Sequence, residues 1–229
     1  MGEPLAEPPQ YGTVVDSAQL DLECASVGGV ESTNLAKFRT RNPVVRWLID
    51  RFYGRLETMV EPLAPGSLLD AGCGEGETIA RLDSLLPARV AAVDLSPDAV
   101  EFTARRFPAI TVTRHSVYDL PFDDSAFELV LCLEVLEHLE DPGAAFTELA
   151  RVSSGTLIVS VPHEPWFRIG SLLRGKYVTN LGNHPEHVNH WTAAGLRSFL
   201  EPRAELLELD ASFPWLLASC RPAQAAPGS

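Results

Sequence analysis

A glycine-rich turn after a short apolar segment constrains this 229-residue chain more than any other feature. Residues 68–76 read Leu-Leu-Asp-Ala-Gly-Cys-Gly-Glu-Gly, so a predicted buried strand ends near Asp70 and glycines follow at alternate positions. Glycine permits left-handed backbone angles and lets a ligand approach the main chain without meeting a Cβ. A helix predicted over about 77–86 would point its free N–H groups and its positive end at the turn. The sequence therefore predicts a nucleotide-type site at the carboxyl edge of a parallel sheet.

The spacing of Gly72, Gly74 and Gly76 narrows the kind of ligand. A dinucleotide fingerprint would place its third glycine at the sixth position, which here is Glu77. A P-loop is excluded, because no Gly-Lys-Ser/Thr follows the turn. The acidic Asp70 just before the turn suits a ligand that is cationic there and carries no pyrophosphate.

Length and charge exclude several classes of protein. A chain of this length is expected to form one α/β domain with additions at its ends. The net charge of −13 repels phosphate backbones and acidic membrane surfaces, so nucleic acid is not an expected partner. No apolar run approaches ~20 residues and no signal peptide is recognised, which predicts a soluble, cytoplasmic protein. The four cysteines lack metal or disulfide spacing and are expected to be reduced thiols.

The domain organisation is predicted from charge and helix signals. Residues 1–36 contain six acids and no lysine or arginine, and they are expected to form an acidic, partly disordered arm. The main domain is expected over 37–221, and a helix over about 43–61 begins it after an Asn-Pro capping pair. Residues 222–229 are expected to be a disordered tail.

Six further strands are predicted after the glycine turn, with helices between most of them. This alternation followed by a late hairpin predicts an α/β fold with a doubly wound, mostly parallel sheet and an antiparallel edge. The six strands are predicted over residues 89–94, 110–114, 127–133, 156–161, 206–210 and 215–220.

Two more carboxylates fall at the same predicted edge of the sheet. Asp94 ends the second strand, where its side chain could accept hydrogen bonds from both hydroxyls of a ribose. Asp119 opens the loop after the third strand, where it could accept the exocyclic amine of an adenine. The apolar residues within 117–122 would supply walls for the ring.

These motifs resemble those of class I S-adenosylmethionine-dependent methyltransferases, in the broad group that includes small-molecule methylases. The resemblance covers about residues 42–220, with the glycine motif at 69–76, the ribose motif at 93–96 and the adenine motif at 119–122 with 127–130. It implies a Rossmann-like, seven-stranded sheet whose last strand is antiparallel, and methyl transfer to a small, partly apolar acceptor, with oxygen or nitrogen favoured. It also implies cofactor contacts by Asp70, Gly72, Gly74, Gly76, Asp94, Leu95, Asp119, Leu120 and Leu133.

The acceptor is expected near the turn after the fourth strand. Glu134, Glu137 and His138 are spaced i, i+3 and i+4, so one helical turn would bring them onto a single face. The turn resembles that of ubiquinone-pathway O-methyltransferases and of enzymes that methylate the 3′ ends of small RNAs, and the latter add a downstream histidine like His187. The resemblance makes His138 and His187 the catalytic candidates. They would accept a proton, orient the acceptor or, with both glutamates, hold a divalent cation.

An insertion over 162–191 separates the fifth strand from the last helix. Its aromatic and apolar residues alternate with basic ones, which predicts an acceptor-side lid, while core cover and a membrane-surface helix remain alternatives.

The expected partner is a small-molecule acceptor, with no nucleic acid, no stable membrane association and a monomeric or homodimeric state. A metal-assisted O-methyltransferase and a non-catalytic, partner-binding member of the fold are the alternative functions.

Overall fold

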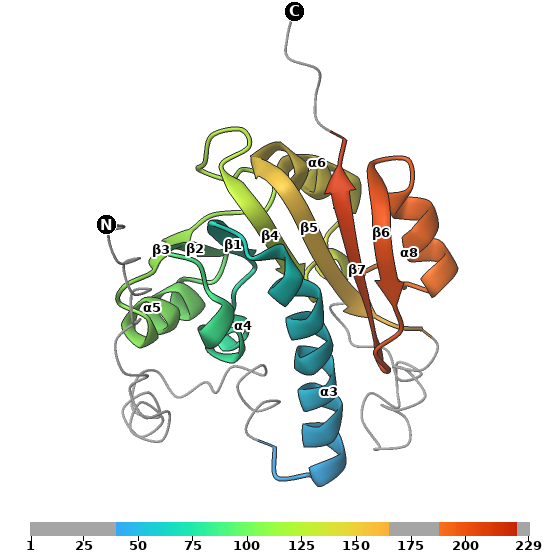
Figure 1. Cartoon of the computed structure of the whole chain (residues 1–229), viewed down its shortest axis with the longest axis horizontal. Helices are drawn as coiled ribbons and strands as arrows, with labels where there is room; N and C mark the ends of the chain where they lie inside the picture. Colours follow the sequence, from blue (N-terminus) through green and yellow to red (C-terminus); the bar gives the residue numbers. More distant parts are fainter. Residues whose placement is uncertain (1–39, 165–187, 224–229) are drawn as a thin grey trace, which may run out of the picture.

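The computed structural model describes residues 40–164 and 188–223 of the chain. The expected acidic arm, most of the 162–191 insertion and most of the expected tail lie outside these residues. Seven strands form one sheet (Figure 1). The strands are β1 (Ser67–Ala71), β2 (Arg89–Asp94), β3 (Thr111–Arg114), β4 (Phe127–Leu133), β5 (Ser153–Pro162), β6 (Ala204–Asp210) and β7 (Trp215–Pro222). The helices are α3 (Pro43–Val60), α4 (Glu77–Arg81), α5 (Pro97–Arg106), α6 (Pro142–Val152) and α8 (Ala193–Leu200).

The order of the strands is β3-β2-β1-β4-β5-β7-β6. β1 pairs in parallel with both β2 and β4, so the direction of winding reverses between β1 and β4. Ligands of doubly wound sheets bind outside the carboxyl ends of the strands at such a reversal. β7 is antiparallel to both neighbours, which confirms the predicted antiparallel last strand. The predicted antiparallel edge is formed by the hairpin of β6 and β7, in which β7 pairs with β5 and β6 is outermost.

Most helices begin where the sequence supplies a capping side chain. Asn42 accepts from the N–H of Val44 at the start of α3, and Ser96 and Asp141 cap α5 and α6 in the same way. The predicted helix over 77–86 is wrong in its length, because α4 ends at Arg81 and a separate 3-10 turn covers Asp83–Leu85. Leu82 between them departs from helical angles (φ −90°, ψ 9°), and its side chain is fully buried.

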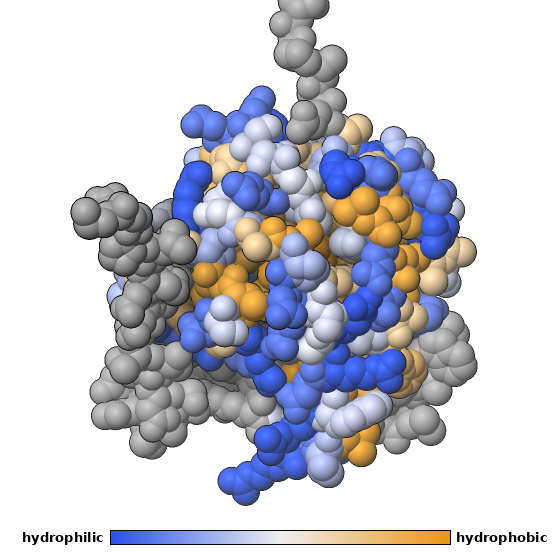
Figure 2. Space-filling view, viewed as in Figure 1, coloured by the Kyte–Doolittle hydropathy of each residue, from blue (hydrophilic) through white to orange (hydrophobic). Residues whose placement is uncertain are grey.

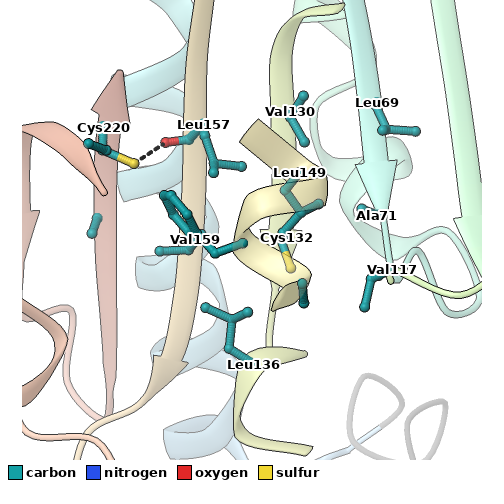
Figure 3. Close-up of a cluster of buried hydrophobic side chains, with 14 of the residues drawn as sticks. Leu69, Ala71, Val117, Val130, Cys132, Leu136, Leu149, Leu157, Val159 and Cys220 are labelled. Atoms are coloured by element: carbon teal, nitrogen blue, oxygen red, sulfur yellow. Dashed lines mark hydrogen bonds between the residues drawn. The ribbon is translucent and has the colours of Figure 1, made fainter. Parts of the chain in front are cut away.

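Two hydrophobic layers cover the sheet. Alternate strand residues face opposite sides, so Leu69 and Ala71 belong to one cluster and Leu68 to the other. The first cluster packs under α6 and α8, and Figure 3 shows its central side chains between the strands and α6. In the same cluster the Cys220 thiol lies 3.5 Å from the carbonyl oxygen of Leu157, to which it donates (Figure 3).

The second cluster packs under α3 and α4. Six apolar or aromatic residues of α3 turn toward the sheet, which confirms the amphipathic helix predicted from the sequence. Hydrophilic residues cover most of the opposite face of this helix (Figure 2). The N-terminal end of α3 extends past the carboxyl edge of the parallel strands (Figure 1). Within the described residues, no helix is long and apolar enough to cross a lipid bilayer.

Candidate cofactor and acceptor site

The three glycines of the turn all have left-handed backbone angles, but for different reasons. A Cβ at Gly72 (φ +86°) would lie 2.3 Å from Cγ2 of Val135, and one at Gly76 (φ +74°) would lie 2.7 Å from Cε2 of Phe107. A Cβ at Gly74 (φ +50°) would meet nothing within 4 Å. Packing against the rest of the protein therefore explains the first and third glycines. The middle one borders open space into which a ligand fits.

Asp94 connects the end of β2 to this turn. Its Oδ2 accepts from the N–H of Gly74 at 2.8 Å, and its Oδ1 accepts from the N–H of Ser96 at 2.8 Å. The carboxylate is half-buried, and each oxygen keeps a second lone pair for another donor. Asp94 therefore holds the turn in place and keeps acceptor capacity, and its predicted contact with ribose hydroxyls stays a prediction.

Asp70 is the penultimate residue of β1, two positions before the glycine turn begins at Gly72. Its side chain is buried, and among the described residues Oδ2 has no hydrogen-bond partner. Burial, and secondarily the charge of Asp94, raises the pKa of Asp70 to about 7. A buried oxygen without a donor fits a ligand that brings a cationic or N–H group, such as the amino-acid end of S-adenosylmethionine.

The predicted adenine loop is fixed by hydrogen bonds to two side chains of α6. Leu120 is buried, and its N–H donates to Oε1 of Glu148 at 2.8 Å. Arg151 donates to the carbonyl oxygens of Leu120 and Phe122 and pairs with Glu148, so the pKa of Glu148 is lowered. Asp119 is exposed beside this loop. The sequence analysis missed the two α6 residues, although their i, i+3 spacing of opposite charges was a usable signal.

Two predicted cofactor leucines complete the edge. Leu95 follows Asp94 and is 64% exposed, and its carbonyl oxygen accepts from Nε of Arg114. Leu133 ends β4 and is half-buried. An exposed apolar side chain beside the ribose carboxylate is suited to cover one side of a bound nucleoside.

The turn after β4 differs from the predicted arrangement. Glu134 has φ +58°, and its Oε1 accepts from Oγ of Ser160 at 3.0 Å, while a 3-10 turn covers only Leu136–His138. Glu137 is buried and His138 is partly exposed, with Nε2 of His138 at 3.8 Å from Oε1 of Glu137. The prediction of one face shared by Glu134, Glu137 and His138 is wrong, because the left-handed residue reverses the chain before the turn begins.

No metal-binding group appears at this turn. Across residues 40–164 and 188–223, no three His, Cys, Asp or Glu side chains gather in a way that could hold an ion. His187, the other predicted catalytic residue and metal ligand, lies outside the described residues. Oε1 of Glu134 accepts a hydrogen bond from Ser160 of β5.

The segment that follows His187 returns to the same turn. The N–H groups of Val188 and Asn189 both donate to the carbonyl oxygen of Glu137, at 2.9 and 3.0 Å. Nδ2 of Asn189 donates to the carbonyl oxygen of Leu139 at 2.6 Å. The backbone next to His187 is therefore fixed against the turn that carries His138, and the sequence analysis did not single out Asn189 for this role.

Comparisons with known proteins agree with this geometry. Residues 69–159 match the family model described as a methyltransferase domain. A "Probable S-adenosylmethionine-dependent methyltransferase" of Mycobacterium tuberculosis is 34% identical over 125 residues, which are 52% of this chain and 45% of that protein. The ubiquinone biosynthesis O-methyltransferase of Xanthomonas oryzae is 36% identical over 98 residues, or 39% of each chain. The chain thus spans about half the length of the M. tuberculosis relative, or less.

The fold has solved counterparts. Magnesium protoporphyrin IX methyltransferase from Synechocystis, solved with bound S-adenosylhomocysteine, superposes with a TM-score of 0.62 at 19% identity. That superposition covers 84% of this chain and 95% of the other. The sheet order and the glycine turn define a Rossmann-like methyltransferase fold. With the family match over residues 69–159 and the named relatives, they support a class I S-adenosylmethionine-dependent methyltransferase family for this chain.

Proposed function

We propose that this protein transfers a methyl group from S-adenosylmethionine to a small, partly apolar acceptor, on oxygen or nitrogen. One observation carries the proposal. Gly74 has open space where a Cβ would lie, and its N–H donates to the carboxylate of Asp94, which the exposed Leu95 follows, at the carboxyl edge where the winding of the sheet reverses. When bound, S-adenosylmethionine supplies a methyl group on a positively charged sulfur, and the acids at this edge suit that charge.

The residues on the cofactor side act by holding and orienting. Asp94 accepts ribose hydroxyls while it keeps the turn in register, and Asp119 accepts the adenine amine beside a loop that Arg151 fixes. Positioning of this kind can lower a barrier by about 7–11 kcal/mol when the reacting atoms are held in line. No side chain of the protein needs to form a bond to the transferred methyl carbon.

His138 is our first choice among the described residues to act on the acceptor. It follows β4 at the carboxyl edge, and its half-exposed ring has room for a ligand beside the buried Glu137. A histidine can take a proton from a hydroxyl or amine near neutral pH. His187 remains a second candidate, because the backbone that follows it is bonded to the same turn.

The cofactor part of the proposal is tested by calorimetry with S-adenosylmethionine and S-adenosylhomocysteine. We expect micromolar binding, and Asp94→Ala should weaken it at least tenfold, which is about 1.4 kcal/mol. Asp123→Ala replaces an exposed acid that is none of the predicted site residues, so it is the matched control and should bind like the wild type. Absence of heat and of a thermal shift with either ligand in the wild-type protein would refute the proposal.

The acceptor is identified by labelled transfer to a cell extract followed by mass analysis of the product. His138→Ala and His187→Ala should then lower turnover and leave cofactor affinity intact. If a divalent ion is used, a chelator should also abolish activity, and Glu137→Ala should do the same. Turnover that is unchanged in both histidine variants would leave positioning as the whole mechanism.

A further inference from the structure

Asp70 is a buried acid, and burial and the charge of Asp94 are the influences on it from the described residues. Its side chain is 1% exposed, and Oδ2 has no hydrogen-bond partner among the described residues. An ionised carboxylate in such a place is costly unless a cation or several donors compensate it. The position is not a remote part of the core, because Gly72 follows two residues later and begins the turn that borders the ligand space.

Four titratable groups on neighbouring elements are near enough to interact electrostatically with Asp70. They are Tyr53 of α3, Cys73 of the glycine turn, Cys132 of β4 and Asp94 of β2. Burial raises the pKa of Tyr53 and of both thiols far above neutral, so these three remain uncharged. The remaining neighbour, Asp94, is an acid. Every electrostatic influence on Asp70 from these groups therefore favours its neutral form.

We propose that Asp70 holds a proton in the ligand-free protein and releases it when the ammonium group at the amino-acid end of S-adenosylmethionine binds beside it. The inference rests on the proposed function. An opposite charge within about 4–6 Å favours the ionised form of a carboxyl group. The ligand supplies the cation that the described residues lack, and the orphaned Oδ2 accepts from it. Cofactor binding is then coupled to the loss of a proton from the protein.

The coupling predicts a specific pH profile. The pKa of Asp70 is about 7 in the ligand-free protein, and the bound ligand should lower it. Binding should therefore release protons at pH values between the bound and the ligand-free pKa. The dissociation constant should fall up to about tenfold for each pH unit between about 5.5 and 7, and it should level off above about 7.5. At about pH 6 close to one proton per bound ligand should be released.

The experiment is calorimetry on the whole chain in two buffers of different ionisation enthalpy, at about pH 6 and about pH 8. The difference in observed heat counts the protons exchanged. Three probes separate the possible charges: S-adenosylmethionine carries a sulfonium and an ammonium, S-adenosylhomocysteine only the ammonium, and 5′-methylthioadenosine neither. Release with the first two probes assigns the ammonium, and release with S-adenosylmethionine alone assigns the sulfonium. The first outcome supports the proposal, and the second contradicts it.

Asp70→Asn tests whether the proton belongs to this residue. The variant keeps the shape of the side chain and cannot ionise, so its proton count should fall to near zero and its affinity should lose its dependence on pH. Asp123→Asn is the control and should keep the wild-type profile. Any protons that Asp70→Asn still exchanges would come from other groups, and the comparison with the wild type subtracts them.

The proposal is overturned if wild-type protein binds S-adenosylmethionine with equal affinity at both pH values and without proton release. It is also overturned if Asp70→Asn, shown to fold by its thermal transition, releases as many protons as the wild type. Should the variant fail to fold, the wild-type proton count with the three probes still decides, since equal release with all of them would contradict a charge-linked proton. An absence of any binding would instead defeat the proposed function.

Discussion

Among alanine replacements in the glycine turn, Gly76→Ala should destabilise the protein strongly. Only Gly72→Ala should destabilise it more. The left-handed φ of +74° costs an alanine about 1–2 kcal/mol. The new Cβ would also lie 2.7 Å from Phe107 and 3.0 Å from Cγ2 of Thr103. Thr103 cannot move freely, because its side chain is buried and its hydroxyl donates to the carbonyl of Gly74 at 2.7 Å.

Overpacking of a buried contact adds about 1–3 kcal/mol, so Gly76→Ala should lower the free energy of unfolding by about 2–5 kcal/mol in total. Two matched variants separate the terms. Gly74→Ala has the left-handed angle without a contact and should lose only about 1–2 kcal/mol. Gly54→Ala lies inside α3 with nothing within 4 Å of the new Cβ, and it should gain up to about 1 kcal/mol.

Urea unfolding followed by circular dichroism measures these differences, provided that the slopes of the transitions agree among the variants. The cofactor affinity of the folded variants is measured as well, so that an effect on binding can be separated from an effect on stability. Gly74→Ala should lose most of its cofactor binding despite its small loss of stability, because its Cβ occupies the ligand space. The reasoning is refuted if Gly76→Ala is no less stable than Gly74→Ala, or if Gly74→Ala binds the cofactor like the wild type.

Three further predictions follow from the contacts behind the site. Arg151→Met removes donors from two loop carbonyls and should cost about 1–3 kcal/mol in urea unfolding, with weaker cofactor binding in calorimetry. The pKa of Glu148 is lowered by Arg151, so the stability from this pair should be complete above about pH 4.3 and lost as the pH falls further. Thermal melts against pH should show this loss, and it should be smaller in Arg151→Met. Asn189→Ala should cost about 1–3 kcal/mol in urea unfolding.

The cofactor side was predictable from sequence because its signals are local. The three glycines mark left-handed angles, and Ser96 and Asp141 mark helix starts, each within a few residues of the feature that it determines. Short runs of apolar residues then predicted the strands, because parallel strands that are covered on both faces are almost continuously apolar. The place of β7 was harder to predict. A hairpin can join a sheet by either of its strands, and only packing selects which one pairs with β5.

The acceptor side was less predictable because its geometry depends on distant contacts. Glu134 is not a glycine or an asparagine, so nothing local announces its left-handed angle. The angle is accompanied by a hydrogen bond from Ser160, which is far along the chain on β5. Helical spacing alone therefore gave the wrong relation between Glu134 and His138. Asn189 was overlooked for the same reason, since its partners are carbonyl groups of a turn some 50 residues earlier.

The two ends of the long segment between β5 and α8 are joined to each other. The N–H of Glu164 donates to the carbonyl of Trp191 at 2.8 Å, and His163 forms a bridge with Trp191. The sheet therefore meets this segment at a closed base, and the entropic cost of closing such a loop rises only slowly with its length. A change in the length or sequence of the residues between these two points therefore need not disturb the order of the strands.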